Sequence, residues 1–143
     1  MNKPRYFSLE ELIRSDTAVS KKIPNLPTWD IIDNLNRLAL FLDDMRDAWG
    51  SGIIVSSGYR CARLNKAVGG VENSTHQKGN AVDIVPANGR MKEFEDFLKD
   101  WLKDKAFDEC LWESKKAGAK WVHFGLVSNK GLQRRKMFGI TAK

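Results

Sequence analysis

The sequence predicts an α+β domain in which helices pack on one face of a small, mainly antiparallel sheet. The first observation is a long stretch at 29–49 whose apolar residues recur at helical spacing. The second is a set of short apolar runs, separated by turn residues, which are typical of strands. The third is a turn at 114–119, rich in small residues and lysine, that favours a hairpin between the last two runs. The four runs are 53–56, 81–85, 110–112 and 121–127.

The N-terminal elements follow from capping residues and prolines. A short helix is expected after Ser8, because Ser8 is a suitable N-cap and Glu11 stands three residues later, as in a capping box. The polar segment 15–27 contains two prolines and is predicted to be a connection. Thr28 is a plausible N-cap for the long helix, and Gly50 is expected to end it.

Two further helices are expected between the strands. The first covers 61–68 and is followed by a pair of glycines, and the second covers 91–102 with an apolar face. Pro86 closes the strand that precedes the second helix. The residues from 128 onward are basic, and the sequence assigns no element to them.

Length and composition indicate one ordinary globular domain spanning 1–143. The chain has 143 residues, of which 42% are hydrophobic and 29% are charged. No apolar run approaches the roughly 18 residues that a membrane helix needs. Residues 1–12 carry charges and lack a long apolar core, so we expect synthesis in the cytoplasm without a secretory signal. A target outside the cytoplasm would then require another route of delivery.

The net charge of +6 favours anionic partners, such as nucleic acid, membrane surfaces or acidic polymers, although it also serves solubility. No helix-turn-helix or RNA-binding signature accompanies the positive residues, so we do not expect nucleic-acid binding. Without a sufficiently long apolar run, we do not expect membrane insertion either. The positive residues are scattered apart from one late cluster, Lys130, Arg134, Arg135 and Lys136.

The chain has only two histidines, and both have the setting of metal ligands. His76 precedes Asp83 by seven residues, and His123 lies in a later apolar run. Two imidazoles and one carboxylate are a common ligand set for catalytic zinc, which keeps a fourth position open for water. The sequence therefore predicts a zinc hydrolase.

The strand pattern supports this ligand set. Side chains alternate between the two faces of a strand. Asp83 is therefore expected on the face of its strand that Val82 and Ile84 do not occupy, and His123 on the face that Val122 does not occupy. If the apolar faces pack on the helices, Asp83 and His123 both point to the open face of the sheet. The zinc site is therefore expected on the face that the helices leave free.

Cys61 and Cys110 are the only cysteines. Nothing in the sequence fixes the distance between them, so whether they pair stays open. Cytoplasmic synthesis favours thiols.

The segment 74–83 reads S-T-H-Q-K-G-N-A-V-D and matches the pattern S-x-H-x-x-G-x-A-x-D. With S-G-Y-R at 57–60 and W-V-H at 121–123, it resembles the zinc D-Ala-D-Ala peptidases. These belong to a group that includes lysostaphin-type enzymes and the hedgehog signalling domain. The chain is most similar to small phage- or bacterium-associated members that cut peptidoglycan. The motif-bearing core covers about 53–127.

The resemblance implies roles for particular residues. His76, Asp83 and His123 fall where the family's zinc ligands lie, with one zinc ion per chain. Glu113 resembles the general base that takes a proton from the zinc water and passes it to the leaving amine. In some relatives the base stands three residues before the last histidine, where this chain has Lys120. The alternatives for the base are Glu109 and Asp108.

Arg60 resembles the family arginine that follows the S-G-Y turn, which implies that it binds substrate and stabilises the oxyanion. Ser74 and Gln77 are candidates for binding the substrate backbone or for orienting the ligands. A local capping role is the alternative for Ser74. Gly79 is expected to serve the backbone geometry between His76 and the next strand.

The function expected from this resemblance is zinc-dependent hydrolysis of a peptide bond in peptidoglycan stem peptides or cross-links, in the manner of an endolysin or a D,D-carboxypeptidase. The absence of a signal favours phage-type release or delivery by a virion. The alternatives are a non-catalytic zinc domain that recognises wall fragments, a structural part of a phage, and a nucleic-acid binder that uses the basic tail. The oligomeric state stays open, with a monomer as the expectation.

Overall fold

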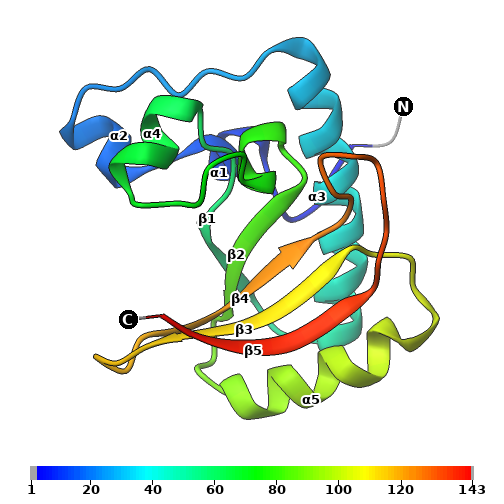
Figure 1. The fold of residues 1–143 in the computed structure, drawn as a ribbon. Helices are drawn as coiled ribbons and strands as arrows, with labels where there is room; N and C mark the ends of the chain where they lie inside the picture. The colour runs from blue at the N-terminus through cyan, green and yellow to red at the C-terminus, as the bar shows by residue number, and fades with distance from the viewer. Residues whose placement is uncertain (1–2, 143) are drawn as a thin grey trace.

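The computed structural model describes residues 3–142, which build a five-stranded sheet with helices around it (Figure 1). Neighbouring strands are antiparallel in every pair except the one formed by Glu109–Lys115 and Lys136–Ala142, which run parallel. The predicted α+β class with a mainly antiparallel sheet is therefore confirmed. In spatial order the strands are β1 (Ile53–Ser57), β2 (Ala81–Pro86), β4 (Lys120–Gly125), β3 (Glu109–Lys115) and β5 (Lys136–Ala142).

Along the described chain, every helix precedes the first strand or lies between two strands. No helix within residues 3–142 is both long enough and apolar enough to cross a membrane. The helices are α1 (Leu9–Ile13), α2 (Asp16–Ser20), α3 (Trp29–Trp49), α4 (Ala62–Ala67), α5 (Met91–Trp101) and the 3-10 turns η1 (Thr75–Lys78) and η2 (Leu102–Asp104).

Helix α3 has the bounds that its apolar spacing predicts, and it runs behind the sheet in Figure 1. Gly50 ends it in the left-handed conformation, with φ 79°, where glycine carries no steric penalty. Leu35, Leu38 and Leu42 lie on one face of this helix and are fully buried. The helix is therefore held by burial of an apolar stripe.

The sheet has one face that packs on helices and one that carries polar groups. Val82 of β2 and Phe124 of β4 are buried in the same core as α3 and α5. Asp83 and His123 occupy the alternate positions of these strands and face the other way, as side-chain alternation predicts. This division of the sheet places the polar site on the face away from α3.

Two segments differ from what the sequence predicts. Within 15–27, Ser15 caps the short helix α2, because its hydroxyl accepts a hydrogen bond from the Ala18 amide at 3.1 Å. Ala18 packs on Ile23 and Leu64 in a small satellite core, so this helix depends on contacts with distant residues. Within the basic segment from 128 onward, for which the sequence predicts no element, Lys136–Ala142 forms strand β5 at the edge of the sheet.

The two cysteines are not bonded to each other. Cys61 caps α4, with its sulfur 3.4 Å from the Leu64 amide nitrogen. Cys110 lies in the main core, where burial raises the pKa of its thiol. Both cysteines therefore have structural settings.

Gly79 follows η1 at the point where the chain turns into β2. Its φ is 74°, and a Cβ there would lie 3.0 Å from atoms of both Ile31 and Leu35 of α3. We expect Gly79→Ala to lower the free energy of unfolding by at least about 2 kcal/mol, since it combines a left-handed alanine with overpacking. Urea denaturation measures this loss.

Gly89 provides the matched control for this substitution. Its φ is also 74°, but a Cβ there would meet no atom within 4 Å. Gly89→Ala therefore carries the backbone penalty alone. An equal loss of stability in the two variants would show that contact with α3 does not restrict Gly79.

Candidate metal centre

His76 lies in η1 and is buried, with its ring fixed by the backbone of a neighbouring loop. Its Nδ1 lies 2.8 Å from the carbonyl oxygen of Gly58. A carbonyl only accepts hydrogen bonds, so Nδ1 carries the proton and donates it. The Nε2 lone pair is left free and points into the site.

The Gly58 carbonyl depends on a close contact between two segments distant in sequence. A Cβ on Gly58 would lie only 2.1 Å from the Leu12 carbonyl oxygen. The adjacent Tyr59 amide donates to this same oxygen at 2.7 Å. The S-G-Y-R turn thus needs glycine in order to pack on the end of α1, and the packing in turn positions the acceptor for His76.

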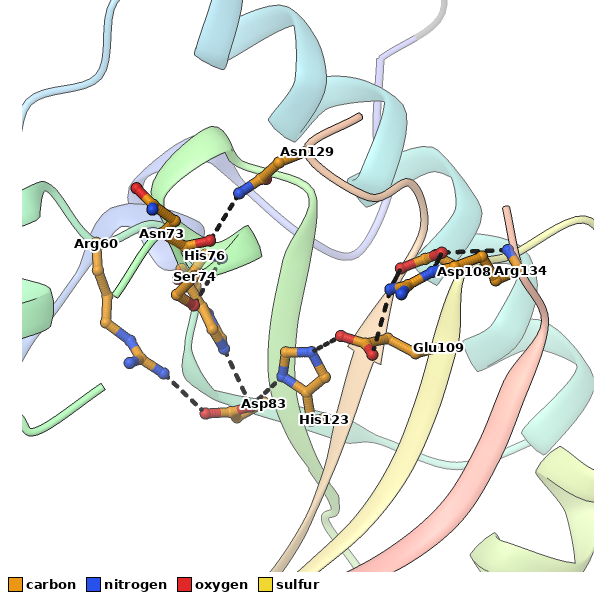
Figure 2. A network of polar contacts seen from close by, with 11 residues as sticks. Arg60, Asn73, Ser74, His76, Asp83, Asp108, Glu109, His123, Asn129 and Arg134 are labelled. Carbon is orange, nitrogen blue, oxygen red and sulfur yellow. Dashed lines mark hydrogen bonds and ion pairs between the residues drawn. The ribbon is translucent and has the colours of Figure 1, made fainter. Parts of the chain in front are cut away.

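Asp83 and His123 stand directly opposite each other on β2 and β4. The Asp83 Oδ1 atom lies 3.3 Å from Nδ1 of His123 and 3.2 Å from Nε2 of His76. One potential ligand atom from each of the three residues lies within 4.8 Å of the others. Figure 2 shows both rings pointing toward the Asp83 carboxylate. The sequence-predicted ligand set is therefore brought together.

The donor atoms of this cluster fit a divalent cation. The buried Nε2 of His76 has no hydrogen-bond partner within the described residues, although a carboxylate oxygen lies close to it. A lone pair facing a carboxylate oxygen is repulsive unless a cation or a proton lies between them. Two imidazoles and one carboxylate are moreover the ligand types that zinc accepts.

The pKa values of His123 and Asp83 show that a positive charge is stabilised beside the Asp83 carboxylate. Burial alone would lower the pKa of His123, but hydrogen bonds to Asp83 and Glu109 outweigh it and raise the pKa to about 9. Burial alone would raise the pKa of Asp83, but the two neighbouring imidazoles, together with the hydrogen bond from His123 Nδ1, hold it below the usual value. The carboxylate therefore stays ionised and available to a cation.

Arg60 lies beside the cluster and is largely buried. Its Nη2 donates to the second carboxylate oxygen of Asp83 at 3.2 Å, while Nε and Nη1 donate to Ser57 and Asn65. Asp83 thus presents one oxygen to the histidines and the other to Arg60 (Figure 2). A guanidinium has five N–H donors, so these three contacts leave two for another acceptor.

Ser74 and Gln77 build the turn that holds His76. The Ser74 hydroxyl accepts from the His76 amide at 3.2 Å, and the Gln77 side-chain oxygen accepts from the Ser74 amide at 3.1 Å. The same Gln77 oxygen accepts from Asn65 at 3.3 Å. These contacts support the ligand-orienting and capping roles, whereas the substrate-binding role stays a prediction.

Glu113 lies on the same face of the sheet as His123. It pairs with Trp121 in the register of β3 and β4, one alternation step from the pair of Leu111 with His123. Burial raises the pKa of Glu113, and the nearby charge of Asp83 adds to this. A carboxyl group with a raised pKa is suited to accept and return a proton near neutral pH.

The two alternative bases have other partners. Asp108 is fully buried and forms a bidentate ion pair with Arg134. The Arg134 Nε and Nη2 atoms each lie 2.8 Å from one of the two carboxylate oxygens. Glu109 contacts the outer nitrogen of His123 at 3.0 Å, and this hydrogen bond lowers the Glu109 pKa. Both carboxylates are thus engaged, which favours Glu113 among the three.

Sequence reasoning missed two features of this site, the Gly58 carbonyl and the contact of Glu109 with His123. A backbone acceptor leaves no signal in side-chain identity, and the glycine of S-G-Y-R is the one sequence feature that could have indicated a close approach there. Alternation does predict that Glu109 shares a face with His123, because it lies two residues from Leu111, the register partner of His123. The contact itself joins diagonal neighbours on β3 and β4, so it depends on how the two strands pair.

A family model matches most of the chain. The model of the family described as Peptidase M15 matches residues 5–124, which include all the candidate ligands and Glu113. A search of curated proteins found no match.

Proposed function

Because the chain belongs to the Peptidase M15 family, it is a peptidase, and we propose that it is a zinc enzyme that hydrolyses peptide bonds of bacterial peptidoglycan. The observation that carries this proposal is the convergence of His76, Asp83 and His123. Their donor atoms lie within 4.8 Å of one another, and the buried Nε2 of His76 has no hydrogen-bond partner among the described residues. Zinc, when bound, supplies a Lewis acid that polarises a carbonyl and makes water more acidic.

In this proposal, residues around the metal transfer the proton and stabilise the oxyanion. Glu113 takes the proton from the attacking water and returns it to the leaving amine. Its raised pKa supports both steps, because the same group must be a base first and an acid afterwards. Arg60 keeps Asp83 oriented and uses its remaining N–H groups to hold the substrate carbonyl oxygen as negative charge develops.

The substrate part of the proposal rests on charge and on the resemblance of the motifs. The chain has a net charge of +6, which favours attraction to an anionic wall polymer. The motifs that contain the ligands resemble those of peptidases that cut stem peptides. Release from a phage-infected cell, or delivery by a virion, stays a prediction for how the protein would reach the wall.

Purified sacculi, with fragment analysis by mass spectrometry, test this function. Wild-type protein should release peptide fragments, a chelator should stop the release, and added zinc should restore it. Loss of a terminal D-alanine would identify a carboxypeptidase. Conversion of cross-linked dimers to monomers would identify an endopeptidase.

One result would favour the alternative of a recognition or structural domain. Such a domain would bind zinc stoichiometrically and adhere to sacculi, yet release no fragment at any enzyme concentration. Release that persists undiminished in chelator would instead contradict the role of the metal.

A further inference from the structure

A chain of polar contacts links the metal centre to Arg134, near the C-terminal strand, by way of Glu109. It begins at His123, whose Nδ1 lies 3.3 Å from Asp83 Oδ1 and whose Nε2 lies 3.0 Å from Glu109 Oε1 (Figure 2). If Nε2 donates its proton to Glu109, the Nδ1 lone pair faces Asp83 and His76. Glu109 thereby selects which nitrogen of His123 can bind a metal.

A glycine makes room for this contact. Gly125 stands opposite Glu109 in the register of β3 and β4. A Cβ on Gly125 would lie 3.2 Å from Glu109 Cγ, which is closer than an ordinary van der Waals contact. The Glu109 side chain thus lies across Gly125 on its way to the His123 ring.

Glu109 is itself held from the other side by Arg134. The Arg134 Nη2 atom lies 3.7 Å from Glu109 Oε2, while the same guanidinium pairs with the buried Asp108. The Arg134 amide also donates to Asp108 Oδ1 at 3.1 Å. Three contacts with Asp108 therefore fix the position from which Arg134 reaches Glu109.

The backbone around Arg134 is fixed by the same part of the chain. The Arg135 amide donates to the Phe107 carbonyl at 3.0 Å, and the Lys136 amide donates to the Asp108 carbonyl at 2.8 Å. Arg134 lies ten residues beyond 5–124, the span that the family model matches. The support for His123 therefore includes a segment outside that span.

We infer that Glu109 and Arg134 are positioning residues of the metal centre: Glu109 orients His123 with Nδ1 toward the metal, and Arg134 holds Glu109. The inference rests on the proposed metal site. A carboxylate that accepts from the outer nitrogen of a ligating histidine fixes the ring and its tautomer, and its loss typically weakens metal binding by 10–100-fold. Neither residue needs to touch the substrate.

Zinc affinity, measured by competition with a chromophoric chelator, tests this inference. We expect Glu109→Ala to weaken zinc binding by about 10–100-fold. Glu109→Gln should lose less, because its amide oxygen still accepts a hydrogen bond. Arg134→Gln should also weaken binding, whereas the matched control Arg90→Gln, which removes an exposed pair with Glu93, should leave it unchanged.

Two results separate the possible failures. If wild-type protein binds no zinc, the proposed metal site is wrong. If wild-type protein binds zinc and a folded Glu109→Ala binds it within twofold of wild type, the positioning role alone is wrong. Thermal unfolding of the metal-free variants establishes that they are folded.

Nitrogen-15 NMR of the zinc-loaded wild type gives a second readout that needs no variant. The chain contains only two histidines, so only two rings appear in the spectrum. The inference requires opposite tautomers, with the proton on Nδ1 of His76 and on Nε2 of His123. A proton on the same type of nitrogen in both rings would overturn it.

Discussion

Replacing Glu113 with glutamine should reduce peptide-bond hydrolysis by about 10²–10⁴-fold, the usual contribution of a general acid–base group. The amide has nearly the same shape but cannot take a proton from water. Because Glu113 is not one of the three metal ligands, the variant should bind zinc as wild-type protein does. Steady-state rates on sacculi, together with metal analysis of the same sample, measure both quantities.

Glu95 offers a matched control for this substitution. It is a partly buried carboxylate on α5, on the side of the sheet that faces the helices. Glu95→Gln should therefore leave the rate within about twofold of wild type. A Glu113→Gln variant with unchanged turnover would remove Glu113 from the mechanism and reopen the choice of base.

Replacing Asp83 with asparagine should, unlike the Glu113 substitution, weaken the binding of zinc itself. The substitution removes the only negative charge among the three ligands, and it also removes the carboxylate that pairs with the Arg60 guanidinium at 3.2 Å in the wild-type protein. We expect zinc affinity to fall by more than the roughly 10–100-fold typical of losing a ligand-orienting group. Hydrolysis should fall with it.

Chelator competition at fixed pH measures this affinity. Asp96→Asn is the control, since Asp96 lies on an exposed part of α5 and pairs with Lys92. The control should bind zinc like the wild type. Wild-type affinity in Asp83→Asn would mean that the metal, if any, binds elsewhere.

The sequence predicts those parts of the fold that local patterns determine. Helix α3 buries a continuous apolar stripe, so periodicity predicts the helix, and the flanking residues Thr28 and Gly50 predict its ends. Strand alternation likewise predicts that Asp83 and His123 share the face opposite Val82 and Val122. The hairpin of β3 and β4 follows from the turn residues between them.

The elements that the sequence does not predict depend on distant contacts. Helix α2 has only five residues, too few for a stable helix on its own, and Ala18 is buried against Ile23 and Leu64. Strand β5 pairs in parallel with β3, and a parallel pair has no local turn to indicate it. Its first residue, Lys136, also belongs to the basic cluster that reads as a solvated tail.

The candidate site divides in the same way. The residues whose side chains carry the chemistry, His76, Asp83, His123 and Glu113, are predicted by motif and alternation. Their supports are the Gly58 carbonyl and Glu109, and each reaches its histidine from another strand or loop. Such contacts exist only once the sheet has formed, so one sequence does not predict them.

Metal content measured on freshly purified protein tests the central claim most directly. Inductively coupled plasma mass spectrometry, after incubation with zinc and removal of the free ion, should find one zinc per wild-type chain. The same treatment of folded His76→Ala protein should leave far less than one. Wild-type protein without stoichiometric zinc, or a His76→Ala variant that retains a full equivalent, would contradict a metal centre built on His76, Asp83 and His123.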